Sequence, residues 1–233
     1  MAHTFLCYMK KIINCNLLKT KTSIMKTLKI FTVGLATLFI ANISYAQVNV
    51  KSPLKTRFGI KAGINLANVT IKSSGLTLSP SSLVAPVGGL YVTLPIGVGG
   101  FQIQPELLYS GQGYKVDKVD GTDGGKGNNN YFVVPVLAKY AIASSAFAFY
   151  AGPQFGYLLS AKETPTGESS TDVKANYKST DISSVFGIEY NLPIGLNLSA
   201  RYQLGMTNVA KDVAADESFK NKSFTFTLGY NIK

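Results

Sequence analysis

The sequence predicts an all-β fold, an eight-stranded antiparallel up-and-down transmembrane β-barrel, from three observations. Apolar and polar residues alternate with a period of two in eight segments of about ten residues each. A secretory signal peptide precedes these segments. The connections between them alternate between long and short. Together these features are typical of an outer-membrane barrel, whose tilted strands need about 9–11 residues to cross the bilayer.

Residues 25–46 have the basic, apolar and cleavage regions of a signal peptide, which forms a helix. The apolar stretch is short for a membrane-anchoring helix, the alternative interpretation, which needs about 20 residues. Cleavage is expected between Ala46 and Gln47. Residues 1–24 are interpreted as an upstream extension from a mis-called gene start, with an extended basic region as the alternative. Residues 47–56 then form a short periplasmic lead-in and residues 57–233 the barrel.

The composition argues against most catalytic and nucleic-acid functions. Six of the 23 basic residues lie in residues 1–46, which hold no Asp or Glu, so residues 47–233 carry 17 basic and 12 acidic side chains, a net of +5. That balance is weak evidence for nucleic acid, which is not expected as a partner. Residues 47–233 contain no Cys and no His. Disulfides, thiolate metal sites and imidazole bases are therefore excluded there, and no cofactor, metal site or enzyme activity is predicted.

One face of each alternating segment is apolar and the other is polar. The segments are FGIKAGINLA (58–67), VGGLYVTLP (87–95), FQIQPELLYSGQ (101–112), YFVVPVLAKY (131–140), FAFYAGPQFGYLLSA (147–161), DISSVFGIEY (181–190), LNLSARYQLGM (196–206) and SFTFTLGYNI (223–232). The apolar faces are unbroken in nearly every segment and carry Phe or Tyr near the strand ends, as an interfacial aromatic girdle does. The polar faces are mainly Gly, Ser, Thr, Asn and Gln, which suit a crowded interior. The apolar faces are therefore predicted to contact lipid.

The predicted interior includes five charged side chains. They are Lys61, Glu106, Lys139, Glu189 and Arg201. An eight-stranded barrel is just wide enough for its own side chains, so these charges must pair. Suitable pairs are Glu106 with Arg201 or Lys139, and Glu189 with Lys61. We interpret the network as structural, a plug that fixes the strand register. A gated ion path or proton relay is the alternative.

The connections predict the orientation in the membrane. Short turns are expected at 95–100, 143–146 and 191–195, and long polar loops at 68–86, 113–130, 162–180 and 207–222. Outer-membrane barrels have short periplasmic turns and long extracellular loops, so all four long loops are expected outside. The stretch GTDGGKGNNN (121–130) has the Gly and Asn of a surface loop. The loops also hold Asp117, Asp120, Asp123, Asp172, Asp212 and Asp216. We interpret them as solvated loop residues, because their spacing matches no calcium-loop motif, with weak binding of a divalent cation as the alternative.

Three motifs in order resemble a known family. YFVVPVLAKY, AGPQFGYLLSAK and RYQLGMTNV resemble strands of the Bacteroidota-type outer membrane β-barrel domain family, the PorT-like or "porin family" group, which is similar in fold to OmpX and the OmpA barrel. The resemblance covers residues 57–233. Met206 and Val209 replace the Leu and Ile usual in the family, and the last residues lack the expected terminal aromatic. The resemblance implies location and architecture but no active site.

Several functions remain open at this stage. The first is a small outer-membrane barrel with a filled lumen and a structural or surface-interaction role through its loops, whose partner the sequence does not name. The others are a passive channel for ions or small solutes, an accessory barrel of a protein-secretion system, an outer-membrane enzyme and a soluble lipocalin-like binder with inverted faces. The expected partners are the lipid bilayer and, during biogenesis, the barrel-assembly machinery.

Overall fold

A computed structural model describes residues 55–73, 76–96, 99–117, 124–211, 214 and 217–232. The signal peptide, the cleavage position at Ala46 and Gln47 and the upstream extension lie outside these residues. Among the residues described, no helix is long and apolar enough to cross a membrane.

The described chain is built almost entirely of strands. They are β1 (Arg57–Ser73), β2 (Leu76–Leu78), β3 (Leu83–Pro95), β4 (Phe101–Val116), β5 (Gly125–Ala141), β6 (Phe147–Pro165), β7 (Thr171–Asp172), β8 (Thr180–Asn191), β9 (Leu196–Gly205) and β10 (Ser218–Ile232), with one 3-10 turn, η1 (Lys174–Asn176). The short strands β2 and β7 only extend the edges of β1 and β6. The other eight strands form the predicted barrel.

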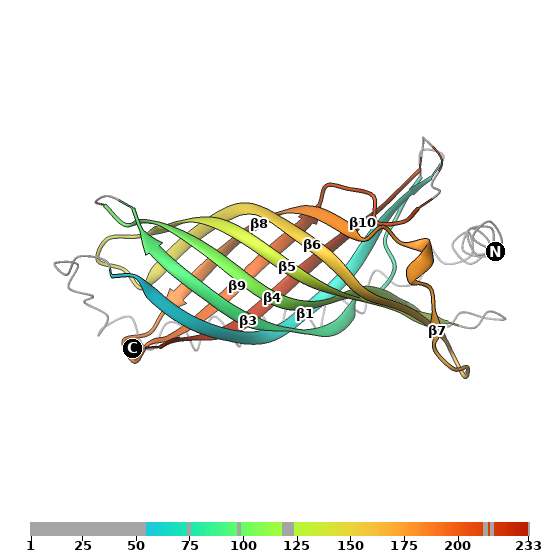
Figure 1. Ribbon diagram of the computed structural model, residues 1–233, viewed down its shortest axis with the longest axis horizontal. Coiled ribbons are helices and arrows are strands. Elements are labelled where there is room, and N and C mark those ends of the chain that lie inside the picture. The colour runs from blue at the N-terminus through green and yellow to red at the C-terminus, as the bar shows by residue number, and fades with distance from the viewer. Residues whose placement is uncertain are drawn as a thin grey trace, which may run out of the picture. The chain divides into compact units, whose positions relative to one another are not determined.

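The eight long strands pair in chain order, and the first pairs with the last. Each neighbour is antiparallel, and β1 closes the ring against β10 over fifteen residue pairs, from Phe58 with Ile232 to Lys72 with Ser218. Figure 1 shows the strands winding obliquely around the barrel, with the C-terminus at the end that carries the short turns. Closure leaves no open sheet edge within the bilayer, where unpaired backbone groups cannot bind water. The up-and-down topology predicted from the sequence is confirmed.

The face assignment is also confirmed. Outward side chains are apolar and exposed, as at Phe58, Leu107 and Phe226, which expose 59%, 48% and 46% of their surface. Their strand neighbours point into the barrel and are buried, as at Glu106 and Thr227. A soluble barrel with inverted faces would show the opposite arrangement, so that alternative is wrong for this fold.

Aromatic pairs mark both ends of the lipid-facing surface. Phe101 contacts Tyr140, and Phe147 contacts Tyr190, with ring centroids 4.8 and 4.9 Å apart, beside the short turns. Tyr202 contacts Phe224 toward the long loops, at 4.7 Å. Rings at two levels are what an aromatic girdle at both membrane interfaces requires.

The strands extend further toward the long loops than the sequence indicates. The stretch 121–130 was expected to be a surface loop, but its second half belongs to β5, which begins at Gly125. Likewise β4 continues to Val116 and β6 to Pro165. Beyond the bilayer both faces of a strand meet water or loops, so apolar alternation is no longer needed and the periodicity fades.

A β-bulge changes the face of residues near the top of β6. Asn130 pairs with Ser160, but the next residue, Tyr131, pairs with Leu158. The extra residue on β6 reverses the alternation, as bulges do. Ser160, expected on the polar inner face with Gln154, therefore shares the outer face with Asn130, whose side-chain amide donates to Ser160 Oγ over 3.0 Å. Leu158 is fully buried inside.

The outward orientation of Leu107 and Phe226 predicts the cost of a charge in lipid. Replacing either by Arg places a cation against the acyl chains and should lower the free energy of unfolding in vesicles by about 2–4 kcal/mol, measured by denaturant titration. The matched control is Thr227→Ser, which keeps the inward hydroxyl that contacts Ser199 Oγ at 2.7 Å and should be nearly silent. An unchanged free energy for Leu107→Arg contradicts the assignment.

Candidate functional site

The five charged residues predicted for the interior lie together inside the barrel, toward the short-turn end. Each exposes 5% or less of its surface. Lys61 Nζ lies 2.6 Å from Glu106 Oε1, and Arg201 Nη2 lies 2.9 Å from Glu106 Oε2. Lys139 forms an ion pair with Glu189. Each of these five charges therefore has a partner of opposite sign, the condition under which a low-dielectric interior tolerates it. The buried Asp181, nearer the long loops, accepts hydrogen bonds from Thr207 and Asn221 instead.

The pairing differs in part from the one expected. The Glu106–Arg201 pair is present, but the second cation on Glu106 is Lys61, and Lys139 binds Glu189 instead. The expectation that Glu189 pairs with Lys61 is therefore wrong. The alternation of residues determines which face of the sheet a side chain lies on. It does not determine the position of the side chain along the barrel axis, which depends on the stagger between strands.

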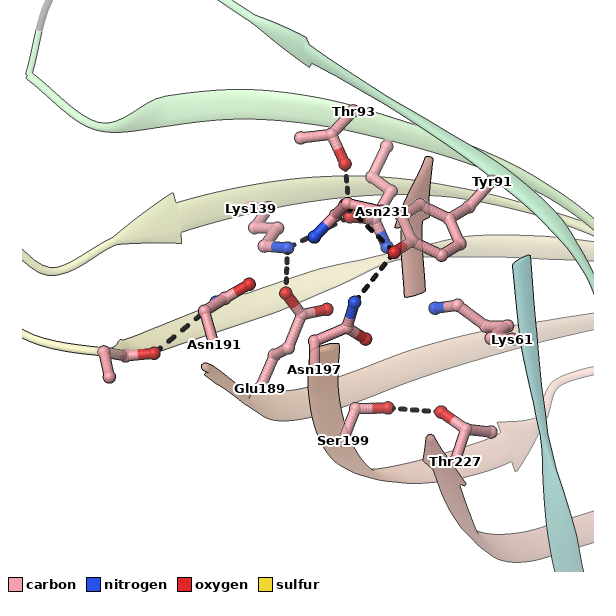
Figure 2. A network of polar contacts seen from close by, with 12 residues as sticks. Lys61, Tyr91, Thr93, Lys139, Glu189, Asn191, Asn197, Ser199, Thr227 and Asn231 are labelled. Atoms are coloured by element: carbon pink, nitrogen blue, oxygen red, sulfur yellow. Dashed lines mark hydrogen bonds and ion pairs between the residues drawn. The ribbon is translucent and has the colours of Figure 1, made fainter. Parts of the chain in front are cut away.

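Gln104 joins the two halves of this charged layer. Its Nε2 donates to Glu106 Oε1 over 2.7 Å, and its Oε1 accepts from Lys139 Nζ over 3.1 Å and from Thr93 Oγ1 over 3.0 Å. Figure 2 shows Lys139 pointing at Glu189, with Thr93 on the opposite side. Three cations and two anions give the layer a formal charge of +1.

Two tyrosines that the sequence analysis did not single out complete the layer. Lys61 Nζ lies 4.7 Å from the centroid of the Tyr91 ring, and Arg201 Cζ lies 5.7 Å from the centroid of the Tyr150 ring. Each ring crosses a glycine on the neighbouring strand: a Cβ at Gly59 would lie 2.2 Å from Tyr91 Cζ, and one at Gly187 would lie 2.4 Å from Tyr150 Cζ. Inward glycines paired with inward tyrosines are the sequence signal that could have found them.

Neutral hydrogen bonds surround and continue the charged layer. Tyr91 donates its hydroxyl to Asn231 Oδ1 over 3.0 Å and accepts from Asn197 Nδ2 over 2.7 Å (Figure 2). Further toward the long loops, Asn65 donates to Ser110 Oγ over 2.9 Å and accepts from Thr225 over 2.7 Å. This amide and hydroxyl layer spans several strands and fixes their relative heights.

An apolar layer closes the end of the barrel that carries the long loops. Its buried members are Val87, Leu108, Tyr131, Val133, Leu158, Ala161, Tyr177 and Val209. Most come from strands, but Tyr177 follows η1 and Val209 lies in the β9–β10 connection. Val209 exposes none of its surface. These two segments bond to each other, with Lys178 N donating to Val209 O over 2.8 Å and Lys211 N to Asn176 O over 2.9 Å. Two long loops thus fold into this end of the barrel, which we call the mouth.

Residues of the RYQLGMTNV motif hold this closure in place. Thr207 Oγ1 accepts from Ile182 N and donates to Asp181 Oδ1, both over 2.9 Å. Asn208 Oδ1 accepts from Phe219 N over 3.1 Å. Val209 N then donates to Phe219 O over 2.9 Å. The same motif places Arg201 in the charged layer.

The ionisable groups of the mouth are tyrosines and acids: Asp181 is buried and accepts from Thr207 and Asn221, and Glu163 accepts from the Tyr114 hydroxyl. Burial raises the pKa of the Tyr177 hydroxyl to about 12, so it stays protonated at neutral pH. The loop acid Asp117 pairs with Lys115 at 2.9 Å outside the mouth, and hydrogen bonds from Ser81 and Lys115 lower its pKa. In the described part of the chain, no three His, Cys, Asp or Glu side chains are grouped as a metal site would need.

The charged layer predicts unequal costs for its two carboxylates. Glu106→Gln leaves Lys61 and Arg201 without their anion and should lower the free energy of unfolding by about 3–5 kcal/mol, as loss of one partner of a buried ion pair does. Glu189→Gln should cost less, because it leaves only Lys139. Both would be measured by denaturant titration in vesicles.

The control for these two variants is Glu168→Gln, at an exposed loop position, which should change the free energy by less than about 0.5 kcal/mol. Equal stability of Glu106→Gln and Glu168→Gln would show that the ion pairs do not hold the strands together.

Comparisons with known proteins identify the family of the chain. Among curated proteins, none matches the chain. Similar solved structures are Neisserial surface protein A (TM-score 0.47, 12% identity), Ail, the attachment invasion locus protein of Yersinia pestis, in complex with the heparin analogue sucrose octasulfate (0.42, 14%), and the outer membrane protein OprG from Pseudomonas aeruginosa (0.39, 14%). The first two matches cover 77% of this chain and all of the other, and the third covers 76% and 95%. The model of the outer membrane protein beta-barrel domain matches residues 45–211, and the chain belongs to this outer-membrane family.

Proposed function

We propose that this outer-membrane barrel is closed to solutes and has a structural or surface-interaction role through its extracellular loops. The observation that carries the proposal is the filled lumen. Leu158, Ala161 and Val209 expose none of their surface, so no water-sized passage runs beside them. The charged layer lies below as a second barrier. A solute would have to displace both layers.

The described parts of the loops support the second part of the proposal, because hydrogen bonds hold them to one another. The two loops that enter the mouth are bonded to each other, and Ser81 pairs with Lys115 through both backbone N–H groups, at 2.9 and 3.0 Å. A hollow of about 430 Å³ lies between the tips of β4, β5 and β6, lined by Lys115, Lys126 and Glu168 among others. It opens outward, where a surface partner would approach.

We further propose that the barrel has no catalytic activity. Residues 47–233 offer neither imidazole nor thiol, and the buried carboxylates Glu106 and Glu189 are held by cations instead of facing an open cleft. Ester or peptide hydrolysis by the purified barrel, lost in a Glu106→Gln variant, would contradict this. An accessory role in secretion would appear as co-purification with a secretion complex from outer membranes.

The motifs support membership of the Bacteroidota PorT-like type and export through a signal peptide. We expect removal of residues 1–46, because Ala46 ends a stretch with the composition of a cleavage site. N-terminal sequencing of the protein isolated from outer membranes of cells expressing the full chain should begin at Gln47. A sequence that begins at any other residue would contradict the cleavage position.

Conductance in planar bilayers tests the closed lumen. Wild-type protein purified from outer membranes should insert without discrete openings, because the apolar and charged layers block the lumen in series. A Tyr177→Gly/Val209→Gly variant should also stay silent, because the charged layer remains intact. A porin of known conductance serves as the positive control.

Two outcomes contradict the proposal. Discrete conductance openings with the wild-type protein would show that it is a channel. Openings only in the Tyr177→Gly/Val209→Gly variant would show that the mouth is the sole barrier, as in a gated pore. Gel migration of unboiled samples would confirm in each case that the barrel is folded.

A further inference from the structure

Three lysines form an outward-facing cluster where β1 meets β10, which we call the seam lysines: Lys72, Lys220 and Lys222. Lys220 and Lys222 lie two residues apart on the outer face of β10. Lys72 pairs with Ser218 on the adjacent strand, diagonally across from Lys220. Diagonal neighbours on one face of a sheet lie about 7–8 Å apart. Three ammonium groups on flexible stems can therefore reach a common ligand.

The seam lysines lie directly above the lipid-facing surface. Phe224, two residues below Lys222, exposes 55% of its surface and belongs to the aromatic girdle with Tyr202. Leu204, the strand partner of Lys222, exposes 48%. Two residues of strand measure about 7 Å, so the cations begin just above the aromatic level. This end carries the long loops, so the cluster lies at the outer leaflet, where lipid headgroups are found.

No carboxylate among the described residues compensates these charges. Neither Lys72 nor Lys220 has an ion pair in the described part of the chain, and Lys222 donates to Ser79 Oγ over 2.7 Å. Glu217, which precedes β10 in the chain, accepts instead from Ser73 Oγ, a buried group, over 2.7 Å. The neighbours on the outer face are Asn68, Thr70 and Ser218. Like charges on adjacent strands repel, which favours binding of an anion between them.

We propose that the seam lysines bind the phosphate groups of a phosphorylated glycolipid of the outer leaflet. The apolar surface below, at Phe224 and Leu204, would contact its acyl chains, while the ammonium groups and the hydroxyl of Ser79 contact phosphate. Each basic residue near an anionic membrane surface strengthens binding about five-fold. This site is independent of the lumen and of the extracellular hollow.

Native mass spectrometry of the detergent-solubilised protein, purified from outer membranes of cells expressing the full chain, tests the site with bis-phosphorylated lipid A as the probe. The Lys72→Gln/Lys220→Gln/Lys222→Gln variant should bind the probe at least about ten-fold more weakly than wild type. Lipid A stripped of its phosphates should bind both proteins equally weakly. Equal binding of bis-phosphorylated lipid A by wild type and variant would overturn the proposal.

The matched control removes three lysines of the same extracellular end that lie away from the seam. The Lys126→Gln/Lys174→Gln/Lys178→Gln variant should bind within two-fold of wild type. A loss as large as in the seam variant would mean that net charge alone acts. Displacement of lipid A by equimolar pyrophosphate would assign the site to soluble phosphate instead of lipid. Unboiled gel migration must show a folded barrel in both variants.

Discussion

The requirement that every backbone polar group be satisfied within lipid governs this molecule. Strands can meet it in a bilayer only by closing into a ring, because no water is available to pair a free edge. The β1–β10 pairing supplies that closure over fifteen residue pairs. Once the ring is closed with eight strands, its interior has room only for side chains. The polar faces must then satisfy one another.

The interior meets that demand in three layers. Near the short turns, two carboxylates bind three cations, with Gln104 between them. Amides and hydroxyls such as Asn65 and Thr225 fill the next level. Apolar side chains close the mouth. Where charge is buried, geometry is demanding because an unpaired ion is costly, so the first layer is the most sensitive to register. The apolar layer depends instead on two loops and on their hydrogen bonds.

The fold and the faces of the strands could be predicted from the sequence, because burial on one face and lipid contact on the other make apolar and polar residues alternate with a period of two. The sequence also placed Lys61, Glu106, Lys139, Glu189 and Arg201 in the interior. Of the ion pairs, Glu106 with Arg201 was among those expected, but Glu189 with Lys139 was not, because the stagger of the strands places Glu189 beside Lys139 instead of Lys61.

Three features could not be predicted from the sequence, for related reasons. The extension of β5 to Gly125 lies where both faces are polar, so no alternation marks it. The bulge near Leu158 shifts the face of Ser160 without any change in composition. The closure of the mouth depends on Tyr177 and Val209, two apolar residues within largely polar loops, and only the three-dimensional path of those loops shows that both turn inward.

The closure of the mouth also orders the assembly of the protein. Phe219 N donates to Asn208 Oδ1, and Phe219 O accepts from Val209 N. Asn221 donates to Asp181 over 3.1 Å. Both Phe219 and Asn221 lie on β10, the last strand of the barrel. β10 reaches its place only when it lies between β9 and β1. The mouth therefore cannot be sealed before the ring is complete, and a partly built barrel stays open at its outer end until the final strand arrives.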